Sequence, residues 1–221
     1  WDACAGTDDP FLSHAFFKAL EESGSVCSET GWLPHHLSIT DDDDNFLAIA
    51  PLYAKTHSYG EYVFDWGWAD AFERAGGTYY PKLQAAVPFT PVTGRRLLVR
   101  DDAPPELADA LISGMMQLAR QSNVSSIHVT FPTEEEWRQF ETHDWLLRIG
   151  QQFHWENRDY ATFDDFLNDL ASRKRKAIRR ERRSVAEQDI AIRTLTGDDL
   201  EERHWDAFYQ FYCDPSNRKW G

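Results

Sequence analysis

The sequence predicts a mixed α/β fold, of the α+β type, in which a mainly antiparallel sheet is flanked by helices. Short apolar runs bounded by turn residues are typical of strands, and longer segments repeat their apolar residues at helical spacing. The two kinds of segment alternate along most of the chain, which is the pattern of layered mixed folds. With 221 residues, 42% of them hydrophobic, the chain can bury a substantial core in one large or two small domains.

The first hundred residues predict one helix and several strands. Residues 11–22 carry apolar side chains at helical spacing, and Asp8 or Asp9 can serve as the N-cap before Pro10. The acidic run at 41–45 favours a solvated turn between two strands, and it lacks the Gly and the distal Glu of a calcium loop. The expected elements are strands at 36–39, 46–53, 59–65, 83–87 and 97–100 and a short helix at 69–75.

The second half predicts several helices and shorter strands. A long helix is expected from Pro104 or Pro105 to Arg120, because proline is favoured in a first helical turn and the apolar residues that follow form one stripe. Thr133 and Glu136 have the spacing of a capping box at the start of a helix at 134–142. The remaining expected elements are strands at 126–131, 145–149, 152–155 and 190–193, a short helix capped by Thr162 or Asp164, a longer helix at 172–188 and an amphipathic helix at 198–212.

The charge of the chain is unevenly distributed. The formal net charge is −14, and an excess of that sign normally repels polyanions. Between Arg173 and Arg183, however, eight basic residues stand against one acid, Glu181, which leaves the rest of the chain with −21. This basic helix is expected to contact the phosphates of RNA or of a lipid-linked precursor at an anionic membrane, or else to dock on the acidic remainder of the same protein. The expected phosphate or nucleic-acid contacts are Arg173, Lys174, Arg175, Lys176, Arg179 and Arg180.

The segment from Tyr59 to Arg96 is rich in aromatic residues and prolines, with Asp, Lys, Gln and Arg placed among them. Ordinary core strands favour aliphatic residues, so this mixture is typical of the wall of a ligand pocket. The alternative is an aromatic-rich core with Pro-Gly turns between its strands.

Asp65 is the first candidate for a general base. It stands between two aromatic residues, where burial would raise its pKa toward a value useful for taking a proton. The alternative is a structural carboxylate that caps a turn or pairs with Arg74. Glu61 and His57 are second-rank bases.

Other residues of the same segment have side chains suited to substrate binding. Lys82 and Arg95 can meet phosphate or carboxylate, although arginines at 95 and 96 could equally be solvent-facing strand ends. Tyr79 and Tyr80 offer rings for stacking and hydroxyl groups for a proton, but in a strand one of the two would point inward. The expected catalytic residues are Asp65, Tyr79 and Tyr80, and the expected substrate contacts are Trp66, Trp68, Lys82, Gln84, Phe89, Thr90, Thr93 and Arg95.

Other catalytic and cofactor-binding patterns are missing from the sequence. His35-His36 has no partner at metal-ligand spacing, and Cys4, Cys27 and Cys213 form no Cys-x-x-Cys. Neither a Gly-x-Ser-x-Gly elbow nor a phosphate loop occurs, so we expect no metal and no tightly bound cofactor. The odd number of cysteines argues for a reducing compartment, and no run approaches the roughly 18 apolar residues that span a bilayer. The expected location is the cytoplasm.

Four motifs span nearly the whole chain: FLSHAFF at 11–17, GEYVFDWGWADA at 60–71, YYPKLQAAVPFTPVTG at 79–94 and RRER at 179–182. Together they resemble the FemAB-like family, described as peptidoglycan biosynthesis or recognition proteins and predicted N-acyltransferases of the GNAT superfamily. The resemblance implies two tandem GNAT-like folds joined by a helical segment. We therefore expect a GNAT-like domain at 1–160, a basic helical linker at 161–188 and the beginning of a truncated second GNAT-like domain at 189–221.

The same resemblance implies transfer of an acyl or aminoacyl group to an amine acceptor, which we expect to be a peptidoglycan precursor or a related cell-wall molecule. The donor is either acyl-CoA or aminoacyl-tRNA. The pattern that cradles a CoA pyrophosphate at a helix N-terminus, Gln/Arg-x-x-Gly-x-Gly/Ala, is absent, since the nearest run, at 74–79, ends in Tyr79. The alternative function is a binding module without chemistry, which recognises glycan or nucleic acid through the aromatic segment and the basic helix. The sequence leaves the oligomeric state open.

Overall fold

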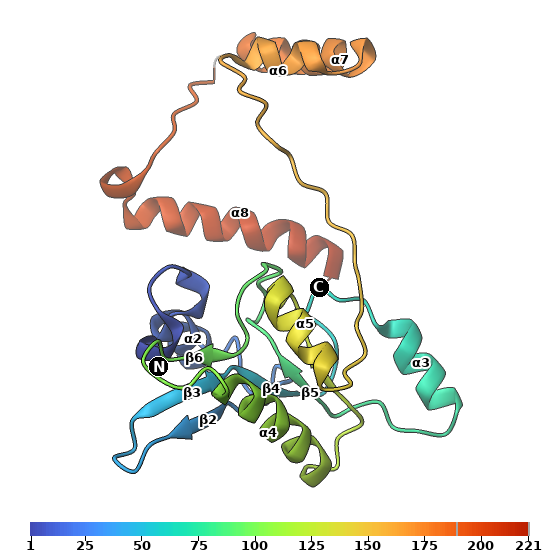
Figure 1. Cartoon of the computed structure of the whole chain (residues 1–221). Coiled ribbons are helices and arrows are strands. Elements are labelled where there is room, and N and C mark those ends of the chain that lie inside the picture. Colours follow the sequence, from blue (N-terminus) through green and yellow to red (C-terminus); the bar gives the residue numbers. More distant parts are fainter. Residues whose placement is uncertain (189, 221) are drawn as a thin grey trace. The chain divides into compact units, whose positions relative to one another are not determined.

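The computed structural model describes the backbone of residues 1–188 and 190–220 and divides the chain into two compact units, Trp1–Gly150 and Gln151–Gly221 (Figure 1). The first unit has the mixed α+β composition and the mostly antiparallel sheets that the sequence predicts, and it is consistent with a GNAT-like fold. Its helices are α1 (Asp2–Ala5), α2 (His14–Glu22), α3 (Trp66–Arg74), α4 (Leu107–Gln121) and α5 (Glu134–Thr142), with a 3-10 turn at Pro10–Leu12.

The strands of the first unit form two sheets. The four-stranded sheet has the order β1 (Trp32–Pro34), β4 (Leu52–Lys55), β5 (Lys82–Ala85) and β7 (Ile127–Val129). The three-stranded sheet has the order β2 (Leu37–Thr40), β3 (Phe46–Ala50) and β6 (Leu98–Val99). All neighbours are antiparallel except β5 and β7, whose connection passes through α4.

Pro51 divides the strand predicted at 46–53 into two. A proline has no N–H to donate to a ladder, and at this position the chain leaves β3 in one sheet and enters β4 in the other. This crossing places the polar residues of β4 beside those of β5.

The helix caps follow the sequence signals closely. The helix predicted at 11–22 begins later, because Ser13 caps α2 while Asp9 caps the 3-10 turn before it. The capping box of Thr133 and Glu136 at the start of α5 is confirmed. In the second unit, Thr162 likewise caps a short helix with a capping box.

Four predicted strands are wrong: 59–65, 145–149, 152–155 and 190–193 have no strand structure. In the first of them, Gly60 and Tyr62 have φ of 78° and 56°, which is incompatible with extended backbone. In the next two, apolar side chains such as Leu146 and Phe153 are 95% and 93% exposed, so no sheet or core receives them. Alternating apolar residues therefore do not make strands here.

In the second unit, the elements at 151–188 and 190–220 that the structure describes are all helical. This unit contains α6 (Phe163–Asp169), α7 (Ser172–Ala186) and α8 (Glu202–Trp220), with a 3-10 turn at Gly197–Asp199, and α6 packs against α7. Over residues 1–188 and 190–220, none of the helices combines the length and the apolar character needed to cross a membrane.

The two faces of the four-stranded sheet differ in character. Leu52, Leu83 and Ala85 on one face pack with Leu111 and Met115 of α4 in the main apolar core. Because side chains alternate along a strand, the residues between them point to the opposite face. That opposite face carries the buried polar side chains of Lys55, Lys82 and Gln84, and we call it the polar face. Trp32 and Tyr53 on the same face pack with Leu12 and Phe17 in a second apolar cluster.

Candidate active site

The polar face of the four-stranded sheet is the candidate site. Register places Lys55 of β4 opposite Lys82 of β5, and places Gln84 between Tyr53 and His128 on the two neighbouring strands. Except for His128, each of these residues is less than 1% exposed. Two lysines opposite each other inside a protein require acceptors and counter-charges.

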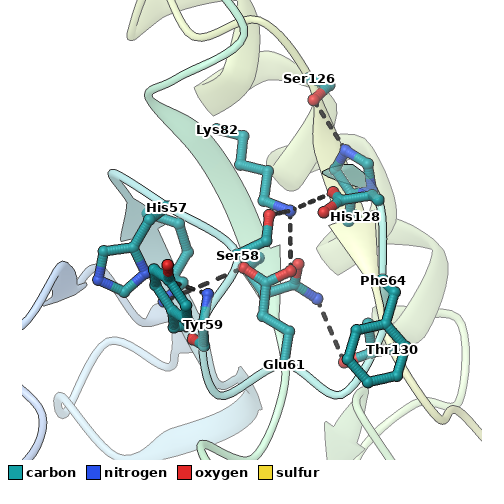
Figure 2. Close-up of polar contacts among 12 residues, drawn as sticks. His57, Ser58, Tyr59, Glu61, Phe64, Lys82, Ser126, His128 and Thr130 are labelled. Carbon is teal, nitrogen blue, oxygen red and sulfur yellow. Dashed lines mark hydrogen bonds and ion pairs between the residues drawn. The ribbon is translucent and has the colours of Figure 1, made fainter. Parts of the chain in front are cut away.

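Lys82 is the centre of this arrangement. Its Nζ donates to Ser58 Oγ at 3.0 Å, to Glu61 Oε2 at 2.8 Å and to Asp65 Oδ2 at 2.7 Å, so each of its three protons has an acceptor (Figure 2). The Tyr79 hydroxyl donates to the same Asp65 oxygen at 2.8 Å. The structure thus brings a lysine, two carboxylates and a tyrosine into one buried cluster.

The second lysine is held differently. Lys55 Nζ lies 3.4 Å from the centre of the Trp32 ring and donates to the main-chain oxygen of Tyr59 at 3.2 Å. Its nearest carboxylate oxygen is Glu61 Oε1, at 4.0 Å. Burial lowers the pKa of Lys55 to about 7, against the opposing effect of Glu61. At neutral pH this amine therefore exists both charged and neutral.

The two carboxylates differ in their proton affinity. Burial raises the pKa of Glu61, although Lys82 opposes the effect. Burial also favours a higher pKa for Asp65, but Lys82, Ser58 and Tyr79 outweigh it, and the pKa of Asp65 is lowered. The sequence argument for a raised Asp65 pKa is therefore wrong, because it considered burial without these partners. Asp65 pairs with Lys82, and Glu61 is the better proton acceptor near neutral pH.

Several buried polar atoms on this face have no hydrogen-bond partner among the described residues. Three are acceptors, Glu61 Oε1, Asp65 Oδ1 and Gln84 Oε1, and two are donors, Trp32 Nε1 and Tyr53 Oη. Glu61 Oε1 does lie 4.0 Å from the Lys55 ammonium. Buried polar groups in native proteins are almost always paired with protein, water or ligand, so these atoms are the ones on this face with hydrogen-bonding capacity left for water or a ligand.

The loop 57–65 lies over the polar face and is anchored to it through Lys55 and Lys82. Its tight turn requires Gly60, since a Cβ there would meet Phe89 Cε1 at 2.6 Å and Trp32 Cζ2 at 3.3 Å. Around the loop, large aromatic side chains that are 40–75% exposed belong to Tyr59, Tyr62, Phe64, Trp66, Trp68, Phe72 and Phe89. The segment thus has a polar interior and an aromatic exterior.

The structure brings together some of the residues expected at the site. Asp65, Tyr79, Lys82 and Gln84 share the polar face, and Tyr80 joins them through a 2.8 Å contact of its hydroxyl with Ser58 Oγ. The expected substrate contacts Trp66, Trp68, Phe89, Thr90 and Thr93 are exposed or half-buried instead.

The two arginines at the end of the aromatic segment are occupied elsewhere. Arg95 donates to the main-chain oxygen of Ala5. The buried Arg96 donates to the main-chain oxygens of Thr130, Arg95 and Val92, at 2.9–3.0 Å. These contacts hold the loop before β6, and neither guanidinium takes part in the Lys82 cluster.

Sequence reasoning missed five members of the site: Trp32, Tyr53, Lys55, Ser58 and His128. His128 Nε2 lies 2.8 Å from Ser126 Oγ, and burial lowers its pKa to about 4, with a further contribution from Lys82, so its ring is neutral at pH 7. A signal was present in the strands. Polar residues recur two apart in Tyr53 and Lys55 and again in Lys82 and Gln84, which predicts a polar sheet face.

Comparison with known proteins assigns the chain to a family. A family model named FemAB-like and described as peptidoglycan biosynthesis/recognition matches residues 1–221. The chain matches no curated protein and no solved structure. No group of three or more His, Cys, Asp or Glu side chains among the described residues is arranged to hold a metal ion.

Proposed function

This chain belongs to the FemAB-like family of peptidoglycan biosynthesis and recognition proteins, and we propose that it is an N-acyltransferase. In this proposal it transfers an acyl or aminoacyl group to an amine on a cell-wall precursor or a related molecule. The observation that carries the proposal is the pair of buried carboxylates bridged by Lys82, with acceptor atoms beside it that have no hydrogen-bond partner among the described residues.

The open acceptor atoms suit an amine. An ammonium group has three protons, and Glu61 Oε1, Asp65 Oδ1 and Gln84 Oε1 are three buried acceptors without hydrogen-bond partners among the described residues. Glu61 Oε1 also lies 4.0 Å from Lys55 Nζ. Two carboxylates close to the incoming nitrogen also offset its charge, since Lys82 neutralises only one negative charge. We assign the acceptor amine to this position.

The amine must lose a proton before it attacks. Glu61 is the proposed base, because burial raises its pKa toward neutral pH. Asp65, whose pKa is lowered, stays ionised and orients the amine together with Lys82 and Tyr79. When the pKa values of two neighbouring acids are shifted apart, the acid with the higher pKa can exchange a proton while the other stays ionised and stabilises charge.

The acyl carbon then forms a bond to the amine and loses its bond to the donor. The amine nitrogen forms a bond to the carbonyl carbon, the carbonyl oxygen gains negative charge, and collapse breaks the carbon–sulfur bond of acyl-CoA or the ester carbon–oxygen bond of aminoacyl-tRNA. The leaving sulfur or ribose oxygen takes the second proton of the nitrogen, which keeps one proton in the amide. The unpartnered donors Trp32 Nε1 and Tyr53 Oη, or the Tyr80 hydroxyl, are the candidates to stabilise that oxygen. The proposed step is the same for either acyl donor, acyl-CoA or aminoacyl-tRNA. We place the reaction in the cytoplasm, because three free cysteines fit a reducing compartment.

A donor screen tests the proposal. The chain is incubated with labelled acyl-CoA or aminoacyl-tRNA and with precursor peptides that carry a free amine, and the amide product is quantified. D65N should reduce turnover at least about 100-fold, in the range of a lost acid–base or electrostatic group. The matched control D70N changes an exposed aspartate of α3 and should leave turnover unchanged. Absence of product with both donor classes and every amine, or equal turnover in D65N and D70N, would contradict the proposal.

The aromatic exterior favours a second candidate, a glycan-binding module without chemistry. Tyr59, Phe64 and Trp68 are 66%, 75% and 53% exposed, and such rings are suited to stacking on sugars. This candidate predicts that F64A/W68A abolishes binding of glycan fragments in calorimetry while no donor gives a product. Product formation would reject it as the whole function.

A further inference from the structure

In the second unit, α6 packs against α7 (Figure 1). Residues of α6 contact three of the basic side chains of α7. Arg179 Nη2 pairs with Asp164 Oδ1 at 3.0 Å, and the guanidinium of Arg182 lies 4.3 Å from the centre of the Phe163 ring. Arg175 donates to a main-chain oxygen of α6 at 3.2 Å. Steps of four and three residues put these three arginines on one side of the helix. They hold the two helices together.

Four of the other five basic residues of α7, Arg173, Lys176, Arg180 and Arg183, form a separate stripe, and Lys174 lies outside it. Steps of three, four and three residues place the four within an arc of about 80° along about 15 Å of the helix. All four are exposed, and none makes an ion pair with a described residue. The stripe is therefore a line of uncompensated positive charge.

The nearby acids do not neutralise the stripe. Asp164 is paired with Arg179, Asp165 caps the start of α6, and Asp169 is held by an arginine and a tyrosine that precede α6. Glu181 is the one acid inside α7, and helical geometry places it outside the stripe. Glu187, the C-cap residue of α7, lies on the side of the stripe one turn beyond Arg183, but it makes no ion pair with a described residue. A solvated protein surface normally mixes both signs of charge, so four cations with a single acid at their end indicate a polyanionic partner.

We propose that the stripe binds the phosphate backbone of double-helical nucleic acid. A duplex carries one negative charge per about 1.7 Å of its axis, so about 15 Å of α7 faces more phosphates than the four cations can neutralise. The residues beside the stripe, Ala177 and Ser184, are small, and the larger Ile178 and Val185 lie on the opposite side of the helix. The stripe therefore lacks the apolar border of a helix that lies on a membrane.

The contact is electrostatic, which fixes its salt dependence. Four phosphate contacts predict a slope of about −3.6 in log K against log salt, hence a loss of about 150-fold between 50 and 200 mM salt. Changing the duplex sequence leaves the affinity unchanged, since phosphates carry no sequence information. The binding is independent of acyl transfer and is measured without any donor or acceptor.

Fluorescence anisotropy of the full chain with a labelled 20-base-pair RNA duplex and the matching DNA duplex tests the proposal. R173Q/K176Q/R180Q/R183Q should bind both duplexes at least about 100-fold more weakly at 50 mM salt, and the single variant R180Q should reduce the slope by about 1. The four side chains are exposed, so circular dichroism should show an unchanged helix content. A difference between the RNA and DNA arms tells which duplex is preferred.

The control K18Q/R74Q/R120Q/R193Q removes the same charge from exposed positions elsewhere and should change the affinity less than about twofold. Vesicles of phosphatidylserine and phosphatidylcholine form a third arm. Equal weakening in the control, no binding of either duplex at 50 mM salt, or binding to vesicles alone would each overturn the proposal. Lack of duplex binding would favour docking of the stripe on the acidic part of the chain.

Discussion

Replacing Lys82 with Met should destabilise the first unit strongly at neutral pH. The side chains of Lys82, Glu61 and Asp65 are each no more than 1% exposed, and the ammonium lies 2.8 and 2.7 Å from the two carboxylates. Removing one partner of a buried ion pair leaves an uncompensated charge and costs about 3–5 kcal/mol. Methionine retains most of the apolar volume, so we attribute this cost to charge and hydrogen bonds. Urea unfolding followed by near-ultraviolet circular dichroism, which reports the buried rings of Trp32 and Tyr53, measures the loss.

The pH dependence of this loss identifies its cause. In the native protein the folded-state pKa of Asp65 is lowered, so its contribution to stability is present above the unfolded value of about 3.9 and is lost as pH falls through the folded-state pKa. Without Lys82, burial raises that pKa, and the contribution is lost as pH rises. Lys55 remains near Glu61, so we expect folded K82M to bind one proton more than the folded native protein. The free energy of unfolding that K82M loses relative to the native protein should therefore grow by about 1.4 kcal/mol per pH unit between pH 5 and 7.

Two further variants control the experiment. K18M removes an exposed lysine that pairs with Glu22 at 3.7 Å and should cost less than about 0.5 kcal/mol. K82M/D65N removes both members of the closest pair and should recover most of the loss. A cost for K82M below about 1 kcal/mol at pH 7, or the same cost at pH 5 and 7, would refute the reasoning.

Two other stability predictions follow from the site and its supports. G60A should cost about 1–3 kcal/mol, because φ of Gly60 is 78° and the new Cβ would meet Phe89. The control G67A places its Cβ in α3 with no neighbour within 4 Å and should stabilise the protein by about 0.5–1 kcal/mol. Equal urea midpoints for the two variants would contradict the close approach at Gly60. E136A should cost about 3 kcal/mol in the same assay, because the buried carboxylate accepts hydrogen bonds from the main-chain N–H groups of Arg96 and Leu97 at 2.7–2.9 Å. A similar loss in the exposed control E135A would show that the negative charge of the helix, and not these hydrogen bonds, is what stabilises the protein.

The fold was predictable where the signals are local. The capping box at Thr133, the stripe of α4 and the basic α7 appear in the structure as the sequence indicates, and of the two caps predicted for α6 the structure shows Thr162. The failed strands share a cause, since alternation predicts a strand only if a neighbouring strand pairs with it. Ile190 and Ile192, at 57% and 76% exposure, lie in the failed segment at 190–193. The assignment of 189–221 to a second GNAT-like domain stays a prediction, and Asp189 and Gly221 lie outside the described residues.

The site was predictable in its members more than in its electrostatics. Residue type and aromatic setting predict Asp65, Tyr79 and Lys82 as site residues, and in the structure Tyr79 and Lys82 each donate a hydrogen bond to Asp65. The sign of the Asp65 pKa shift was not predictable, because it depends on which partner reaches the carboxylate. The contact of Lys55 with the Trp32 ring was not predictable either, because it depends on the register of β1 against β4.

The most direct test of the catalytic role of the polar face measures stability and turnover together in E61Q. The raised pKa of Glu61 means that its ionised form is less favourable inside the folded protein than outside, so the neutral amide should leave the urea midpoint unchanged or higher at pH 7. As the proposed base, the same change should lower amide formation by about 100-fold or more. Loss of stability together with full turnover would show that the buried carboxylates are a structural ion network and would contradict the proposed site.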